Sequence, residues 1–305
     1  MQQLFKENWI QFIHELQDSI CTELEKLDGK AVFLKDDWNR AEGGGGRTRV
    51  IQQGNVFEKG GVNTSVVFGS VTDSMRTQLK IEGAQWFAAG ISLVLHPFNP
   101  RVPTVHANYR MFELYNDNCS LKDRWFGGGT DLTPYYLNEE DAKHFHGTYK
   151  KICDITDPSF YSKFKKDCDD YFVNKHRDHE RRGIGGIFFD YQREDEKRST
   201  DFWMNFAKAC GYGFLDAYLP IVNNRKDLPF TPAEKHWQEI RRGRYVEFNL
   251  VHDRGTLFGL KTNGRIESIL MSLPPTVRFE YDFNPASGTE EDKLLQVCLN
   301  PRDWA

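Results

Sequence analysis

Two long strand-like runs joined by a short turn constrain the fold of this chain more than any other feature. The runs are Trp86–His96 and Thr104–Tyr115, and each sorts its residues onto two alternating faces. The link between them contains Pro97, Asn99 and Pro100, which are typical of a turn. We therefore expect the two runs to be antiparallel neighbours in one sheet.

Other segments extend this pattern on both sides. Apolar residues at helical spacing open the chain, and Gly29 is placed to end that helix. Arg49–Phe57 and Val62–Phe68 are predicted strands, with Glu58–Gly61 as the turn between them. We predict a helical block over Glu139–Arg177, broken near Asp157, and then a strand over Ile184–Tyr191. Helices are predicted over Asp201–Leu219 and Ala233–Arg242, and a series of strands and turns over Arg244–Tyr281. Hairpins dominate and no linker is evident, so we expect a single α+β domain over residues 1–305, with an antiparallel sheet covered by helices.

Composition and motif spacing exclude several classes of function. The 305 residues carry a formal net charge of −4, which argues against a broadly basic surface for nucleic acid. No run of 18 apolar residues predicts a transmembrane helix, and the N-terminus lacks a secretion signal pattern, so a cytoplasmic location is expected. The clusters Gly43–Gly46 and Gly183–Gly186 lack the spacing of phosphate-binding loops, which argues against a nucleotide-dependent enzyme.

One face of the second strand in the opening pair carries side chains suited to a binding site. Alternation places His106, Asn108 and Arg110 together, and the preceding strand can add Ser92 and His96 if the register allows. The set offers an imidazole, a guanidinium able to bind a carboxylate through two hydrogen bonds, and neutral donors. A polar sheet face washed by solvent is the alternative interpretation.

Two further segments could bind an anionic or nitrogen-containing ligand. Gly127–Gly129 would let the backbone approach a ligand, and Asp131 follows among apolar residues. Asp131 could pair with cations or accept hydrogen bonds from ring nitrogens, and the alternative is an aspartate that caps a turn. Arg265 directly follows the turn at Asn263 and Gly264, where it could bind a carboxylate.

The remaining basic residues and histidines give weaker signals. The clusters Lys175–Arg182 and Arg241–Arg244 are expected to form solvated surface or an oligomer interface. The nine histidines contain no H-x-x-x-H or H-E-x-x-H motif, so their spacing alone does not predict a metal site.

Six runs, spread over nearly the whole chain, are similar to motifs of one enzyme family. They are Ser92–His96, His106–Arg110, Trp125–Pro134, Arg181–Gly186, Gly243–Leu250 and Asp253–Leu260. Together they closely resemble the oxygen-dependent coproporphyrinogen III oxidases. The resemblance implies a large antiparallel sheet flanked on both sides by α-helices. It also implies a homodimer whose interface includes His176 and Tyr245–Glu280.

The same resemblance implies a reaction and its site. The reaction is the oxidative decarboxylation of two propionates of coproporphyrinogen III to vinyl groups, which gives protoporphyrinogen IX in haem biosynthesis. O2 is the oxidant and no organic cofactor is needed. Catalytic roles are implied for His106 as proton donor, for Asp131 as the carboxylate that holds pyrrole nitrogens, and for Arg110. The implied substrate-binding residues are Ser92, Asn108, Tyr109, Arg110, Asn263, Gly264 and Arg265. A divalent metal is also possible, and the implied ligands are His96, His106, His146 and His176.

The chain departs from the family pattern at three positions outside this set. Tyr191 and Gln192 stand where the family commonly has aspartate and leucine, and His252 stands where bacterial relatives have tryptophan. We expect Arg110 and Arg265 each to bind a propionate, and His106 to move a proton. The main alternative is a non-catalytic tetrapyrrole carrier, which would need the arginine contacts but not His106 and Asp131 as a pair.

Overall fold

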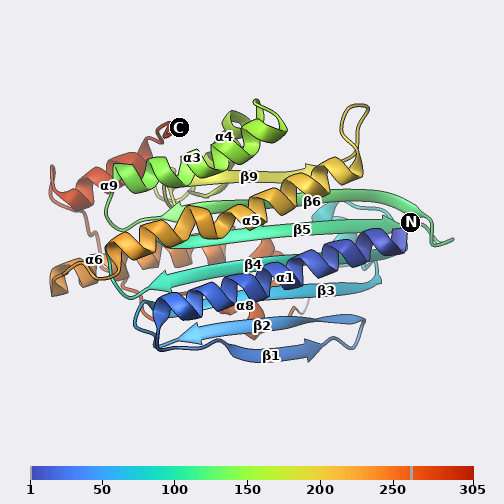
Figure 1. Ribbon diagram of the computed structural model, residues 1–305, viewed down its shortest axis with the longest axis horizontal. Helices are drawn as coiled ribbons and strands as arrows, with labels where there is room; N and C mark the ends of the chain where they lie inside the picture. Colours follow the sequence, from blue (N-terminus) through green and yellow to red (C-terminus); the bar gives the residue numbers. More distant parts are fainter. Residues whose placement is uncertain (1, 262–263) are drawn as a thin grey trace.

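A seven-stranded antiparallel sheet forms the centre of the protein (Figure 1). The computed structural model describes residues 2–261 and 264–305. The strand order is β1-β2-β3-β4-β5-β6-β9. The strands are β1 (Leu34–Asn39), β2 (Gly44–Gln52), β3 (Phe57–Ser70), β4 (Gln85–Pro97), β5 (Thr104–Tyr115), β6 (Leu121–Thr133) and β9 (Gly185–Gln192), and a separate small hairpin consists of β7 (Val173–Asn174) and β8 (Glu180–Arg181).

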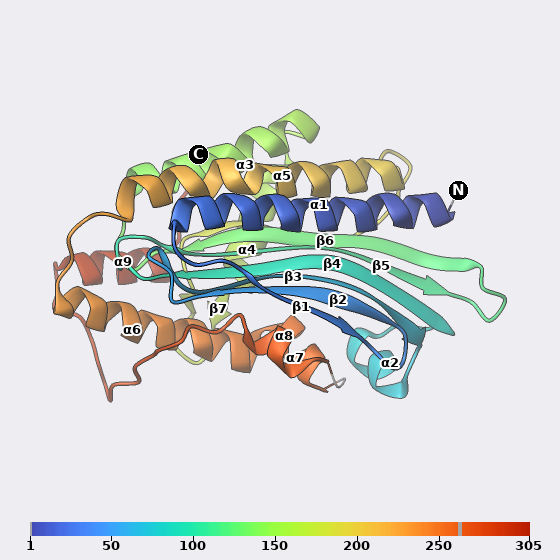
Figure 2. The ribbon, with the colours of Figure 1, turned by 60° about the horizontal axis from the view of Figure 1, so that its bottom comes forward.

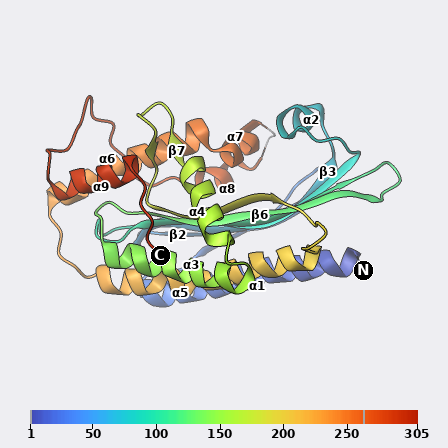
Figure 3. The same ribbon diagram turned by 90° about the horizontal axis from the view of Figure 1, so that it is seen from above.

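Helices cover both faces of this sheet (Figures 2 and 3). One face, which we call the α1 face, lies under α1 (Gln2–Asp28), α3 (Glu139–Thr156) and α5 (Thr200–Arg225). The opposite face, the α6 face, lies under α6 (Pro232–Glu247), a π-helical turn η1 (Phe248–His252), α7 (Arg254–Lys261) and α8 (Ile266–Leu270). The remaining helices are α2 (Asp73–Leu79) between β3 and β4, α4 (Phe160–Tyr171) along β9, and α9 (Glu290–Leu299) beside α6. Within the described residues, none of the helices is long and apolar enough to span a membrane.

The main apolar core lies on the α1 face. On β5 its members are the odd-numbered residues, among them Val105, Tyr109 and Met111, because successive strand residues point to opposite faces. Trp9 of α1 belongs to the same core, and its indole N–H donates to the carbonyl oxygen of Ala89 at 2.9 Å. The even-numbered residues of β5 are thereby directed to the α6 face.

Polar contacts hold α8 and the residues after it on the α6 face. Asn63 Nδ2 donates to the carbonyl oxygen of Ser268 at 2.9 Å, and His96 Nε2 lies 2.8 Å from the carbonyl oxygen of Ser272. A Cβ added at Gly61 would collide with Met271 Sδ, so the helical segment packs directly on the backbone of β3. These contacts place α8 over β3 and β4.

The expected α+β sheet with helices on both faces is confirmed, but two local predictions were wrong. The loop between β2 and β3 is 53–56 and not Glu58–Gly61. Gly60 lies inside β3, where a side chain would collide with Leu95, so this glycine serves close packing and not a turn. Arg244–Tyr281, predicted as strands and turns, forms the end of α6, η1, α7, α8 and an irregular segment. Its short apolar runs fit either periodicity, and packing over the sheet decides in favour of helix.

Candidate active site

Cross-strand register gathers the polar side chains of the α6 face into neighbouring rows. In one row, Asn108 of β5 lies between Ser92 of β4 and Gly129 of β6. In the next row, His106 lies directly opposite Asp131. The meeting of Ser92 with the β5 residues, which alternation alone left open, is therefore confirmed.

A buried charge cluster is centred on Asp131 of β6. Its Oδ1 lies 2.7 Å from His106 Nδ1, and Arg182 Nη2 donates to Oδ2 at 2.8 Å and to Oδ1 at 3.0 Å. Burial acts to raise the pKa of Asp131, but the charge of Arg182 and the hydrogen bond from His106 outweigh it, so the pKa is lowered. An ionised carboxylate only accepts hydrogen bonds, so Nδ1 of His106 carries the proton and Nε2 is available for exchange.

Aromatic and polar side chains hold Arg182 in position beside Asp131. Its guanidinium lies 4.1 Å from the ring centroid of Phe172 and 4.5 Å from that of Tyr245, and Nη1 donates to Asn249 Oδ1 at 2.8 Å. The residue is only 3% exposed. An unpaired charge at such depth is strongly unfavourable, so Arg182 and Asp131 depend on each other.

Sequence reasoning missed Arg182 because it grouped this residue with a solvated basic cluster. Its only distinguishing signal was its place at the start of the glycine-containing motif Arg181–Gly186. The run continues into β9, whose Gly186 lies opposite Asp131 in the sheet. The short connection between the arginine and β9, the edge strand that pairs with β6, explains why Arg182 reaches Asp131.

Arg110 stands one row beyond Asn108 and is held at both terminal nitrogens. Nη1 donates to Asn108 Oδ1 at 2.9 Å, and Nη2 lies 2.8 Å from Asp190 Oδ1. The other oxygen of Asp190 lies 3.5 Å from Arg254 Nη2. A cavity of about 500 Å³ borders Asp190 and Arg254, with Phe188 in its wall. Neither Asp190 nor Arg254 was predicted, although strand alternation in β9 would have placed Asp190 on this face.

Tyr109 lies apart from these side chains. It points to the α1 face, where it is 1% exposed and its hydroxyl donates to the carbonyl oxygen of Cys210 at 3.0 Å. The same hydroxyl contacts Thr130 Oγ1. The side chain of Tyr109 therefore does not face the predicted substrate contacts on Asn108 and Arg110.

Arg265 lies toward the β1 edge of the sheet. Its Nη1 donates to Ser268 Oγ at 3.0 Å, and its Nη2 pairs with Asp36 of β1 at 2.5 Å. Gly264 precedes it and its backbone N–H donates to the carbonyl oxygen of Gly259 at 2.8 Å. Asn263, predicted with them, lies outside the described residues.

The four histidines considered as metal ligands are not brought together. His106 pairs with Asp131, and His96 is buried beneath the segment that follows α8. His146 is buried in α3, on the α1 side of the sheet, whereas His176 lies in the β7–β8 hairpin. Across residues 2–261 and 264–305, no group of three or more His, Cys, Asp or Glu side chains could hold a metal ion. These residues do not fit a shared metal centre.

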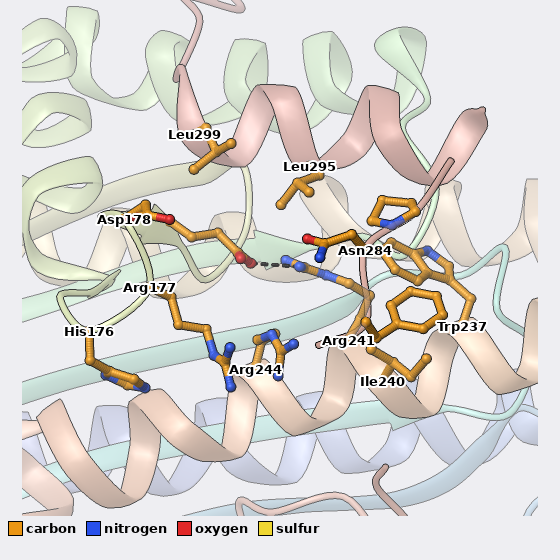
Figure 4. Close-up of a pocket in the computed structure, with 13 residues that line it drawn as sticks. His176, Arg177, Asp178, Trp237, Ile240, Arg241, Arg244, Asn284, Leu295 and Leu299 are labelled. Carbon is orange, nitrogen blue, oxygen red and sulfur yellow. Dashed lines mark hydrogen bonds and ion pairs between the residues drawn. The ribbon is translucent and has the colours of Figure 1, made fainter. Parts of the chain in front are cut away.

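The second basic cluster is buried, contrary to the prediction of a solvated surface or interface. Arg241, Arg242 and Arg244 are 3%, 1% and 8% exposed. A cavity of about 280 Å³ lies beside Arg241 and Arg244, between α6, α9 and the β7–β8 hairpin (Figure 4). Arg241 pairs with Glu180 at 2.6 Å, and Arg244 shares Glu247 with Arg177, so carboxylates of the protein already contact these guanidinium groups. This cavity is therefore a poor candidate for an anionic substrate.

Comparison with known proteins identifies the family of the chain. The sequence model of the family described as coproporphyrinogen III oxidase matches residues 8–304. The chain belongs to this family. It is 54% identical to the oxygen-dependent coproporphyrinogen-III oxidase, chloroplastic, of Glycine max over 302 residues, which cover 96% of this chain and 77% of the relative. It is 53% identical to coproporphyrinogen-III oxidase 1, chloroplastic, of Arabidopsis thaliana, with the same two coverages. It is 51% identical to the Hordeum vulgare relative, with coverages of 98% and 80%.

Proposed function

We propose that this protein converts coproporphyrinogen III to protoporphyrinogen IX with O2 as oxidant, and that the reaction takes place on the α6 face of β4, β5 and β6. Membership of the family supports the reaction. The location is supported by the buried Asp131, which hydrogen-bonds to both His106 and Arg182 beside a row of groups able to bind carboxylates. Perturbed, buried charge pairs of this kind are typical of functional sites.

The chemistry assigns distinct tasks to the protein side chains. Each conversion of a propionate to a vinyl group releases CO2, one proton and two electrons, and O2 accepts the electrons. His106 Nε2 is the atom that exchanges a proton with the substrate, since Asp131 fixes the ring through Nδ1. The negative charge of Asp131 stabilises positive charge that develops on the imidazole and on nearby pyrroles.

Arg110 binds a carboxylate of the substrate, and Asn108 and Ser92 lie beside it on the same face. A guanidinium matches a carboxylate through two parallel hydrogen bonds. Arg265, which lies near the β1 edge, remains the predicted contact for a further propionate. Discrete contacts of this kind let a protein of net charge −4 bind a substrate with four carboxylates.

Aerobic incubation of the purified protein with coproporphyrinogen III tests the proposal. We expect divinyl product to form in air, and its formation to cease when O2 is removed. A non-catalytic carrier would bind the tetrapyrrole but give no vinyl product in either condition.

Metal analysis of the same preparation, with the assay repeated in chelator, tests the predicted histidine ligands. We expect full activity in chelator, because the four histidines are separated.

We also propose that the protein is a homodimer that associates through part of Tyr245–Glu280. Exposed apolar side chains in this stretch support an interface, namely Leu250, Val251, Leu260, Ile266 and Phe279. Tyr245 itself is buried, so it is not a contact residue. Sedimentation equilibrium of the wild type and of Val251→Asp checks this assembly, and a wild-type monomer would exclude it.

The cytoplasmic location expected from the sequence remains a proposal. The names of the Glycine max and Arabidopsis thaliana relatives assign those two proteins to chloroplasts. Fluorescent tagging of the full-length protein in its own cells distinguishes the two compartments.

A further inference from the structure

Arg110 already has a carboxylate partner within the protein. Asp190 Oδ1 lies 2.8 Å from Nη2 of Arg110, at one of the two terminal nitrogens that a substrate carboxylate would use. Asn108 holds the other terminal nitrogen at 2.9 Å. Each of these nitrogens keeps a second N–H, so a propionate that binds Arg110 shares the guanidinium with Asp190 and competes with it for the positive charge.

The sheet is built to accommodate this ion pair. Arg110 of β5 lies opposite Gly127 of β6, and Asp190 reaches across from β9, the next strand. A Cβ added at Gly127 would lie 2.7 Å from Asp190 Oδ1 and 2.9 Å from Arg110 Nη2. The glycine thus leaves the space in which the two side chains meet, which explains one glycine of the Gly127–Gly129 run.

Asp190 also has a second cation within reach. Its Oδ2 lies 3.5 Å from Arg254 Nη2, and the 500 Å³ cavity borders both residues. When a stronger carboxylate ligand takes Arg110, Asp190 can turn toward Arg254 and keep an ionic partner. Release of Arg110 therefore does not leave the partly buried carboxylate of Asp190 unpaired.

We propose that Asp190 is a specificity-determining residue that occupies Arg110 and gives way only to a ligand whose further carboxylates bind elsewhere on the α6 face at the same time. The inference rests on the proposed role of Arg110 in substrate binding. It assigns two effects to Asp190. The residue weakens substrate binding by competition, and it keeps smaller anions such as inorganic phosphate off Arg110.

The variant Asp190→Asn tests this competition, because asparagine keeps the shape and can still accept the hydrogen bond from the Tyr191 N–H. We expect KM for coproporphyrinogen III to fall at least threefold while kcat stays within twofold, and inhibition by inorganic phosphate to strengthen. The matched control is Asp123→Asn, which removes a carboxylate paired with Arg193 at 2.9 Å, away from Arg110. This control should leave KM and phosphate inhibition unchanged.

A merely structural Asp190 would give a lower kcat or melting temperature with KM unchanged, and that result overturns the proposal. A raised KM overturns it as well. In an Arg110→Ala background, Asp190→Asn should no longer lower KM, because the group it competes for is gone. If the wild type shows no turnover, the proposed function fails. The competition is then still measured by fluorescence titration with coproporphyrin III, an unreactive tetracarboxylate that should bind Asp190→Asn more tightly than the wild type.

Discussion

The two faces of β5 differ in function: residues that point to the α1 face contribute to stability, and the alternate residues, on the α6 face, contribute to chemistry. On the α1 face, Tyr109 and Met111 are buried among apolar residues, and the Tyr109 hydroxyl donates to the carbonyl oxygen of Cys210. On the α6 face, His106, Asn108 and Arg110 meet charged side chains from β6, β9 and the segment before β9. We therefore expect a substitution on the α1 face of β5 to affect stability, and a substitution at the next position, on the α6 face, to affect catalysis.

The largest effect is expected for Asp131→Asn, because it removes the charge that both His106 and Arg182 require. We expect kcat/KM to fall by about 10²–10³-fold, as when one preorganised electrostatic contact is lost from an active site. The free energy of unfolding should also fall, by about 3–5 kcal/mol, because Arg182 is left buried without its partner. Steady-state kinetics and urea denaturation measure the two effects.

Circular dichroism controls for the folded state of this variant. Full turnover with an unchanged pH–rate profile would show that Asp131 is not part of the site. A loss of stability without a loss of kcat/KM would make the α6 face a structural surface like the α1 face, and the contrast between the two faces would disappear.

The sequence predicts the contrast between the faces well, because alternation in a long strand is a strong signal. It assigns His106 and Arg110 to one face and Tyr109 to the other, as the structure confirms. Alternation within β5 could not supply Arg182 or Asp190, since both come from segments distant in sequence and reach this site from beyond β6. Contacts between segments far apart in sequence depend on packing that local patterns do not encode.

The helices over the α6 face were harder to predict for a related reason. Arg241, Arg242 and Arg244 form a charged run that is typical of solvated surface, yet all three are buried, and Arg241 and Arg242 pair with carboxylates from other elements. The partners Glu58 and Glu180 lie more than fifty residues away in sequence, so no local pattern reveals the pairing. Short apolar runs in Arg244–Tyr281 likewise fit strand or helix until the sheet beneath them is known.

Acid should destabilise both sides of the sheet, because each buries a neutral histidine. Burial lowers the pKa of His96 well below its usual value, and it lowers that of His146 to about 3. An unfolded histidine binds a proton near pH 6.5, whereas the folded one does not, so this stability is present above pH 6.5 and is lost as pH falls. We expect a loss of about 1.4 kcal/mol per pH unit for each residue below that pH.

Urea unfolding at pH 7.0 and pH 5.5 measures this dependence. In His146→Gln the slope with pH should fall by about half, because one of the two histidines is gone and His96 remains. Equal stability at both pH values would show that these histidines are accessible to protons in the folded protein. The outcome tests burial on each side of the sheet independently of catalysis.

A smaller effect, confined to binding, is expected for Arg110→Ala on the α6 face. Loss of a paired arginine should raise KM roughly 30-fold, equivalent to about 2 kcal/mol, with a smaller change in kcat. The matched control is Arg278→Ala, which removes an exposed arginine paired with Glu239 away from β5. Near-wild-type kinetics for Arg110→Ala would remove Arg110 from substrate binding and weaken the role given to Asp190.

The smallest effect is expected for Tyr109→Phe, one position from Arg110 on the opposite face. The variant loses the hydrogen bond from the hydroxyl to the carbonyl oxygen of Cys210 and the contact with Thr130, but keeps the buried ring. The free energy of unfolding should fall by about 1 kcal/mol, the usual contribution of one buried hydrogen bond. KM and kcat should not change, because the side chain points away from the α6 face. If instead KM rose while stability stayed constant, Tyr109 would contact substrate as family resemblance implies, and the two faces of β5 would not be functionally separate.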